Sequence, residues 1–280
     1  MIISTIGGGL GNQLFTYANG YAVAKRLGTK LILDKSFLDQ AQYRKPEILK
    51  MNIKYEKIFS TEQKYWLQRM LWRRMVHAWW RIRYRYFDGE WYFKYNRSPL
   101  EIKDNTYFFL TGGFWVMKYC SVYRQDLLEM FAPGPDYNMS EGCKRFIDQV
   151  RGCDSVAVHI RRGDYVRIGI CLKDTFYYAC CDKMEEIVKD PVYFVFSEDM
   201  DYVKHMFKDR KGKFVYVEYS SSNLTLDDFF IMKECKHDII SRSSYSFWAA
   251  WLNNNPNKTV VCPRRKDDLY PQEWIQMDTE

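Results

Sequence analysis

The sequence contains no long hydrophobic run, and this absence argues against a chain that crosses a membrane. None of its apolar stretches approaches the roughly 20 residues that a helix needs to span a bilayer. Its first charged residue is Lys25, yet a glycine-rich stretch interrupts the uncharged start and no basic region opens it. This pattern does not match a signal peptide, so we expect a cytoplasmic protein.

Paired cysteines at the spacing of a zinc site are also missing. Eight cysteines are present, but no two are separated by only two residues, and Cys180 and Cys181 are adjacent. The spacing suits neither a zinc site nor a small disulfide framework. We therefore expect reduced, mostly structural thiols.

Internal repeats and low-complexity segments are absent as well. The 280 residues, 47% of them hydrophobic, suffice for one large domain or two moderate ones with a real core. The net charge of +7 favours an anionic partner, which could be a nucleotide sugar, a membrane surface or nucleic acid. The aromatic content of 18% is compatible with carbohydrate contact, although aromatic cores and interfaces are its commoner cause.

What the chain does contain is an alternation of strand and helix patterns. The predicted strands cover residues 1–6, 30–34, 106–110, 156–160, 192–196, 214–217, 237–241 and 259–262. The predicted helices cover residues 13–27, 114–131, 175–189, 199–208, 225–235 and 244–253, with a further start at Ser140 and Glu141. This rhythm predicts the α/β class with doubly wound parallel sheets. The sequence Pro133-Gly-Pro-Asp-Tyr137 interrupts it, so we predict two domains, 1–137 and 138–280.

Two adjacent arginines, Arg161 and Arg162, stand where the predicted strand 156–160 ends before Gly163. Ligands of open α/β sheets bind at that carboxyl edge, and a guanidinium fork suits phosphate oxygens. Successive extended residues point opposite ways, so we expect one arginine to face the ligand and the other to pair with a carboxylate, Asp164 being nearest. The alternative is a structural Arg–Asp pair that closes a turn.

Two more stretches after predicted strands have residues suited to a nucleotide site. Asp199 and Asp201 form a DxD sequence, which holds a divalent metal in some glycosyltransferases but also fits the first turn of a helix. A serine cluster, Ser243, Ser244 and Ser246, opens an apolar helix, and a helix start with added hydroxyls suits a phosphate. Simple capping of the helix is the alternative.

Two further features leave several interpretations open. The glycine-rich loop at 7–11 partly resembles a dinucleotide-binding turn, but Asn12 occupies the third glycine position, and this asparagine would equally suit a helix cap. The segment 66–86 interleaves arginines with tryptophan and tyrosine. It could meet a membrane surface, an acceptor or single-stranded nucleic acid, or simply be a solvated face over an aromatic core.

Three of these stretches resemble a known family. His159-Ile-Arg-Arg-Gly-Asp164 matches the HxRRxD motif of the α-1,2-fucosyltransferases in glycosyltransferase family 11. Gly8-Gly-Leu-Gly-Asn-Gln13 is similar to the family's N-terminal GGLGNQ signature. The run from Ser243 to Leu252 resembles its S-S-F-S-W-W-A-A-W-L signature, with Tyr245 and Phe247 as mild changes. The three stretches touch both ends of the chain, so the resemblance covers most of its length.

The resemblance implies a GT-B fold, in which two Rossmann-like domains with parallel sheets face a central cleft. Domain 1–137 would lie on the acceptor side and domain 138–280 would bind GDP-fucose. The implied reaction is inverting transfer of L-fucose from GDP-fucose to the 2-hydroxyl of a terminal galactoside, without metal or other cofactor. Which galactose-terminated oligosaccharide accepts the sugar is not implied.

The resemblance also implies roles for single residues. Asn12 would contact the donor, and Ser197, Glu198 and Asp199 would line the nucleotide site without binding a metal. Arg161 would stabilise the diphosphate leaving group, because fixed cationic donors must replace a metal there. Arg162 and Ser243, Ser244 and Ser246 belong to the same predicted donor site. His159 and Asp164 are the candidates for a general base. The alternatives are a metal-dependent GT-A glycosyltransferase using Asp199 and Asp201, a nicotinamide or flavin enzyme, and a basic module that binds polyanions.

Overall fold

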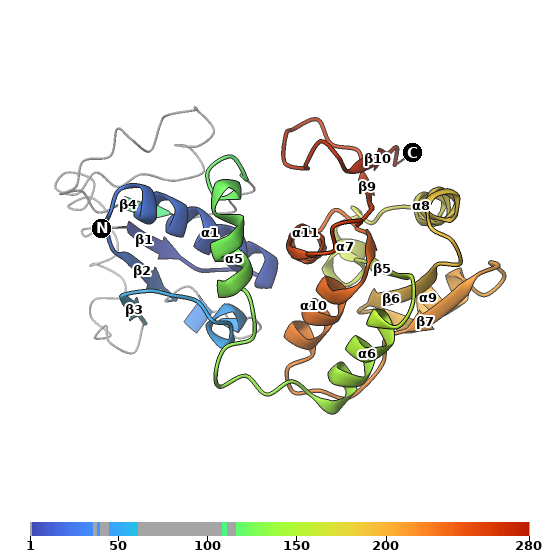
Figure 1. Cartoon of the computed structure of the whole chain (residues 1–280), viewed down its shortest axis with the longest axis horizontal. Helices are drawn as coiled ribbons and strands as arrows, with labels where there is room; N and C mark the ends of the chain where they lie inside the picture. The colour runs from blue at the N-terminus through green and yellow to red at the C-terminus, as the bar shows by residue number, and fades with distance from the viewer. Residues whose placement is uncertain (1, 36–37, 40–44, 61–107, 111–115, 280) are drawn as a thin grey trace. The chain divides into compact units, whose positions relative to one another are not determined.

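The computed structural model describes residues 2–35, 38–39, 45–60, 108–110 and 116–279 (Figure 1). The chain divides into two compact units, Met1–Tyr137 and Asn138–Glu280. The basic aromatic segment 66–86 lies outside the described residues. Within the described ranges, no helix has both the length and the apolar character that a membrane-spanning segment requires.

The first unit contains a four-stranded sheet whose described pairings are all parallel, in the order β3-β2-β1-β4. Its strands are β1 (Ile2–Thr5), β2 (Leu31–Asp34), β3 (Lys57–Phe59) and β4 (Phe108–Leu110). Its helical segments are α1 (Leu10–Arg26), η1 (Glu47–Lys50), η5 (Ser121–Tyr123) and α5 (Arg124–Met130). The predicted strand–loop–helix–strand start is therefore confirmed, and the chain turns after α1 at Gly28, whose φ of 61° suits glycine.

Two helix boundaries in this unit were predicted wrongly. Helix α1 begins at Leu10, because Gly9 rather than Asn12 is its N-cap residue. The helix expected over 114–131 is wrong at residues 116–123, where irregular chain, a turn and the short segment η5 precede α5. Val116, Ser121 and Val122 have weak helix propensity, which explains why a turn wins there.

The second unit contains a six-stranded parallel sheet in the order β10-β9-β8-β5-β6-β7. Its strands are β5 (Ser155–Ile160), β6 (Val192–Ser197), β7 (Lys213–Tyr216), β8 (His237–Ile239), β9 (Val260–Pro263) and β10 (Ile275–Met277). Its helices are α6 (Glu141–Arg151), α7 (Gly163–Arg167), α8 (Asp174–Ile187), α9 (Met200–Met206), α10 (Leu224–Glu234) and α11 (Ser244–Leu252). The five predicted strands and five predicted helix positions are confirmed, while α7 and β10 were not predicted.

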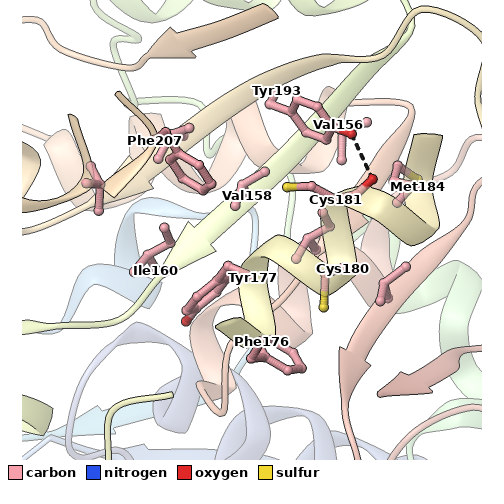
Figure 2. Close-up of a cluster of buried hydrophobic side chains, with 14 of the residues drawn as sticks. Val156, Val158, Ile160, Phe176, Tyr177, Cys180, Cys181, Met184, Tyr193 and Phe207 are labelled. Carbon is pink, nitrogen blue, oxygen red and sulfur yellow. Dashed lines mark hydrogen bonds between the residues drawn. The ribbon is translucent and has the colours of Figure 1, made fainter. Parts of the chain in front are cut away.

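Helix α8 covers one face of this second sheet. Alternate residues of β5, Val156, Val158 and Ile160, point into a buried cluster with side chains of α8 (Figure 2). Cys180, Cys181 and Met184 supply the helix side of the cluster. The Tyr193 hydroxyl from β6 donates to the Cys181 carbonyl at 3.1 Å, so the polar tip of this buried ring is satisfied.

Helix α11 contacts the opposite face. The intervening β5 residues, Ser155, Ala157 and His159, are buried too, and successive residues of a strand point to opposite faces. His159 meets Tyr245 of α11 with 5.5 Å between ring centroids. With helices on both faces, the second unit is doubly wound, as predicted.

The strand order of the second sheet contains one reversal of direction that positions a ligand site. The chain proceeds from β5 outward through β6 and β7, then returns to pair β8 on the other side of β5. Such a switch point separates the loops that follow the two central strands, and ligands of open α/β sheets bind there, outside the carboxyl ends. In this unit that place lies beyond Ile160 of β5 and Ile239 of β8.

Candidate active site

The carboxyl ends of β5 and β8 are tied together by side-chain contacts. His159 Nδ1 lies 2.9 Å from Ser241 Oγ, so a residue near the end of β5 contacts the loop that follows β8. The Tyr165 hydroxyl donates to the Arg242 carbonyl at 3.1 Å. These contacts hold the two loops at the switch point in a fixed arrangement, which a catalytic site requires.

Arg161 follows β5 directly and is held from two sides. Its Nη2 donates to Asp164 Oδ1 at 2.6 Å, and its Nη1 pairs with Glu198 Oε1. Its guanidinium carbon also lies 5.3 Å from the centroid of the Tyr165 ring. The Arg161 side chain is 23% exposed. The guanidinium is therefore fixed at the strand end and still reachable from solvent.

Arg162 is bound to a different set of groups. Its guanidinium carbon lies 3.4 Å from the centroid of the Tyr202 ring, and its Nε pairs with Asp199 Oδ2 at 3.4 Å. One arginine was expected to pair with a carboxylate, and both do. Asp164, expected beside the arginine that turns away from the ligand, pairs with Arg161, the arginine expected to face it. Residues 163–167 form the helix α7 where an extended loop was expected. The helical turn brings Asp164 next to Arg161.

Glu198 joins the two arginine residues. Besides the ion pair of its Oε1 with Arg161, its Oε2 accepts a hydrogen bond from the Arg162 backbone N–H at 3.2 Å. Its neighbour Ser197 ends β6, and the Ser197 hydroxyl accepts from the Asp199 N–H at 3.2 Å. The loops after β5 and β6 thus form one charged cluster of Arg161, Arg162, Asp164, Glu198 and Asp199.

The two aspartates of the DxD sequence serve helix α9. Asp199 is its N-cap residue, and Asp199 Oδ1 accepts from the Tyr202 N–H at 3.3 Å while Oδ2 pairs with Arg162. Asp201 lies in the first turn, where an acidic residue favours the helix dipole. Among the residues that the structure describes, no three His, Cys, Asp or Glu side chains are grouped so that they could hold a metal ion.

His159 is buried behind this cluster, with 5% of its surface exposed. Burial, reinforced by the nearby charge of Arg161, lowers the pKa of His159 from 6.5 to about 3. The imidazole is therefore neutral at physiological pH and a poor proton acceptor. This environment argues against His159 as a general base and favours a positioning role through Ser241.

The serine cluster at the start of α11 is mostly turned inward. Ser243 is the N-cap residue, and its Oγ accepts from the Tyr245 N–H at 3.3 Å. Ser246 is 1% exposed, and its Oγ donates to the Ser243 carbonyl at 3.4 Å and lies 3.5 Å from Ser241 Oγ. Ser244 occupies the first turn and is half-buried. The capping interpretation thus describes Ser243, and Ser246 belongs to a buried chain that reaches His159 through Ser241.

In the first unit, the glycine-rich loop after β1 is held by one buried side chain. Gln13 Nε2 donates to the Gly8 carbonyl at 3.0 Å and to the Lys45 carbonyl at 2.8 Å. Gln13 Oε1 accepts from the Ile48 N–H at 3.2 Å. Asn12 lies in the first turn of α1, and a Cβ on Gly8 would come within 2.8 Å of its Nδ2. Gly8, with φ of 69°, therefore lets the loop approach the Asn12 amide closely.

Sequence reasoning missed three residues that shape the site: Tyr165, Tyr202 and Ser241. The Tyr165 ring contacts the Arg161 guanidinium, and the Tyr202 ring contacts that of Arg162. Ser241 orients His159. An aromatic residue soon after each charged motif was the available signal for the tyrosines. No sequence pattern connects Ser241 with His159, since parallel pairing of β5 with β8 creates that contact.

Comparison with known proteins identifies the family. The sequence pattern described as glycosyl transferase family 11 matches residues 3–278. The chain belongs to this family. It is a glycosyltransferase, which rules out the nicotinamide or flavin enzyme and the simple polyanion-binding module as its class. Family 11 membership also confirms the resemblance drawn from the HxRRxD, GGLGNQ and serine-rich stretches.

Individual relatives agree with the family. An α-1,2-colitosyltransferase of Escherichia coli is 27% identical over 297 residues, covering 99% of each chain. A galactoside α-(1,2)-fucosyltransferase 2 of Gorilla gorilla gorilla is 24% identical over 257 residues, covering 88% of this chain and 67% of that one. The crystal structure of the fucosyltransferase NodZ from Bradyrhizobium shares the fold, with a TM-score of 0.52 at 14% identity and coverage of 89% and 91%. The predicted GT-B class is thereby confirmed.

Proposed function

We propose that this family 11 enzyme transfers L-fucose from GDP-fucose to the 2-hydroxyl of a terminal galactoside, with inversion and without a metal. The observation that carries the proposal is the position of Arg161, fixed and partly exposed at the switch point of a Rossmann-ordered sheet. Two relatives are named for an α-1,2 linkage, which supports the regiochemistry.

In the transfer, the 2-hydroxyl oxygen of the galactoside bonds to C1 of fucose as the bond from C1 to the diphosphate breaks, and the hydroxyl proton passes to water or to the departing diphosphate. Breaking the bond between fucose and GDP gathers negative charge on the diphosphate and positive, oxocarbenium character on the sugar. A preorganised guanidinium next to the developing charge lowers that barrier, and its cation cannot be titrated away. We assign this role to Arg161, and we assign Asp164 the role of orienting it, given their 2.6 Å hydrogen bond.

The other donor-site residues have smaller proposed roles. Arg162 and Asp199 fix the loops after β5 and β6 to each other through their ion pair. The first-turn amide of Ser244 in α11 is a donor suited to a phosphate oxygen, with Ser243 capping the same turn. Asn12 is proposed to contact the fucosyl part of the donor. The second unit would thus bind GDP-fucose, and the first would select the acceptor.

The metal-dependent GT-A alternative has little support. Each of the two units has its own parallel sheet. The Asp199 carboxylate accepts a hydrogen bond from the Tyr202 N–H and pairs with Arg162. An activity assay of the whole chain tests whether a metal is needed. Purified protein, GDP-fucose and a galactoside such as lactose are incubated with EDTA, and the product linkage is determined by NMR. We expect an α-1,2 product and unchanged turnover with EDTA; dependence on added manganese would refute the metal-independent mechanism.

Transfer of colitose is a second candidate, because a relative matched along 99% of both chains is named an α-1,2-colitosyltransferase. Colitose is fucose without its 3-hydroxyl group, so both GDP-sugars place the same diphosphate on Arg161. Competition between GDP-fucose and GDP-colitose in one assay gives kcat/KM for GDP-fucose divided by kcat/KM for GDP-colitose. A ratio above one assigns fucose as the donor, and a ratio below one assigns colitose.

The cytoplasmic location and the peripheral membrane contact also remain proposals. The support for the membrane contact is compositional: segment 66–86 places arginines between tryptophan and tyrosine residues, a mixture that suits an anionic lipid surface. Sedimentation of the full chain with anionic and neutral vesicles tests the contact. Binding to anionic vesicles that falls as salt rises is expected, and equal recovery in the supernatant with both vesicle types would contradict it.

A further inference from the structure

We propose that Glu198 is a resident counter-ion of Arg161, which yields its place to the donor's diphosphate and takes it back as GDP leaves. The inference rests on the proposed function, because it names the ligand that displaces Glu198. It assigns to Glu198 a part in exchange and product release, in place of direct contact with the nucleotide.

The Glu198 carboxylate occupies the kind of donor set that binds a phosphate group. Its Oε1 pairs with the Arg161 guanidinium, and its Oε2 accepts from the Arg162 backbone N–H at 3.2 Å. A guanidinium and a backbone amide that converge on two oxygens of one anion are typical of phosphate recognition. The carboxylate therefore stands where two phosphate oxygens would be bound.

Glu198 is also placed so that its side chain can leave while the loop stays. Its neighbours are anchored: the Asp199 N–H donates to Ser197 Oγ, and Asp199 caps helix α9. The Glu198 side chain itself is 39% exposed, so rotation carries its carboxylate into water. Asp164, by contrast, comes from the same loop as Arg161 and keeps the guanidinium oriented throughout the exchange.

Charge makes the exchange necessary. A diphosphate and a carboxylate that meet the same edge of one guanidinium repel each other, and like charges side by side oppose binding. Donor binding is then an exchange of anions at Arg161, and part of the attraction for GDP is spent on displacing Glu198. When the sugar has been transferred, the returning carboxylate competes with GDP and favours its release.

The test compares full-length wild type, Glu198→Gln and Glu234→Gln by calorimetric titration with GDP and, separately, with inorganic pyrophosphate. Glu234 pairs with Arg151 at 2.7 Å on the surface helices α10 and α6, so its variant removes the same charge away from the site. We expect E198Q to bind both ligands about three- to tenfold more tightly than wild type, since the glutamine keeps the shape without the opposing charge. E234Q should match wild type.

Salt dependence supplies a second measurement that a merely structural role would not move. In wild type one anion replaces another at Arg161, whereas in E198Q the ligand meets a guanidinium that keeps Asp164 but has lost the opposing charge of Glu198. The affinity of E198Q for GDP should therefore fall more steeply between low and high salt. Product inhibition by GDP should strengthen by the same factor as binding.

The outcomes separate this inference from the proposed function. GDP affinity of E198Q equal to or weaker than that of wild type overturns the counter-ion role and leaves the fucosyl-transfer proposal standing. If wild type does not bind GDP but pyrophosphate binds more tightly to E198Q, the counter-ion role stands and the donor assignment fails.

Discussion

The loops that follow β1 and β5 occupy equivalent places in their sheets but differ in charge. Each follows the first strand of its unit, and each such strand has neighbours on both sides. The loop after β1 contains glycines and no ionisable residue, and it is fixed by the neutral amide of Gln13. The loop after β5 belongs to a cluster of two arginines and three carboxylates.

This difference matches two kinds of ligand. An uncharged loop offers backbone groups and the Asn12 amide, which suit the hydroxyls of a sugar. The loop after β5 offers guanidinium groups, which suit the oxygens of a diphosphate. Four substitutions test whether the two loops differ in this way, and they follow in order of decreasing effect.

Removing the cation of the charged loop should abolish most activity. Arg161→Ala deletes the guanidinium that we propose as donor to the leaving diphosphate, and loss of such a preorganised donor lowers kcat by about 10²–10³-fold. Arg151→Ala removes an exposed arginine from α6 and should leave kcat unchanged. Steady-state assays with GDP-fucose measure both variants. Near-normal turnover of the Arg161 variant would show that the charged loop does not stabilise the leaving group.

Removing the clamp of the neutral loop should affect stability more than chemistry. Gln13→Ala leaves the buried Ile48 N–H and the Gly8 carbonyl without the hydrogen bonds that Gln13 makes. We expect the free energy of unfolding to fall by about 2–4 kcal/mol, seen as a lower urea midpoint. Gln149→Ala on the exposed face of α6 is the matched control and should leave the midpoint in place. A stable Gln13 variant would mean that the loop is fixed by other contacts.

Burial of His159 in β5, behind the charged loop, should make folding sensitive to acid. Its folded pKa of about 3 lies below the ordinary 6.5, so between these values the unfolded chain binds a proton that the folded chain excludes. This contribution to stability is present above about pH 6.5 and is lost as the pH falls towards 3. His159→Asn removes it, and the slope of unfolding free energy with pH should decrease by about 1.4 kcal/mol per pH unit. Equal slopes in both proteins between pH 4 and 6 would contradict the burial of a neutral imidazole.

The smallest effect is expected at Asn12. A neutral hydrogen bond to the donor contributes about 0.5–1.5 kcal/mol, so Asn12→Ala should raise the KM for GDP-fucose by about two- to tenfold and change the urea midpoint little. Initial-rate measurements over a range of donor concentrations supply the comparison. A loss as large as that of the Arg161 variant would place the neutral loop at the reacting diphosphate and end the contrast between the two loops.

The regular elements were predictable, because their signals are local. Helix α6 was expected from Ser140, and the Ser140 hydroxyl does accept from the Cys143 N–H at 3.1 Å. Three of the short elements escaped prediction: β3 and β10 have three residues each and α7 has five, too few to show a period by themselves. Missing α7 had a consequence at the site, since an extended loop would have left Asp164 beside Arg162, and the helix gives it to Arg161 instead.

The chemistry of the site was predictable in kind but not in its pairings. The arginines, acidic residues and serines stand at strand ends, which the alternation of elements revealed. Their partners depend on which strands become neighbours: β6 beside β5 brings Glu198 to Arg161, and β8 beside β5 brings Ser241 to His159. The low pKa of His159 likewise follows from burial by α11, which no local pattern encodes.

A crystal structure of the full chain with GDP bound in the presence of EDTA tests the central claim most directly. If Arg161 neutralises the departing diphosphate, the β-phosphate will lie within hydrogen-bond distance of its guanidinium, and Glu198 will have turned away. A diphosphate bound elsewhere, with Arg161 still paired to Glu198, would contradict the account.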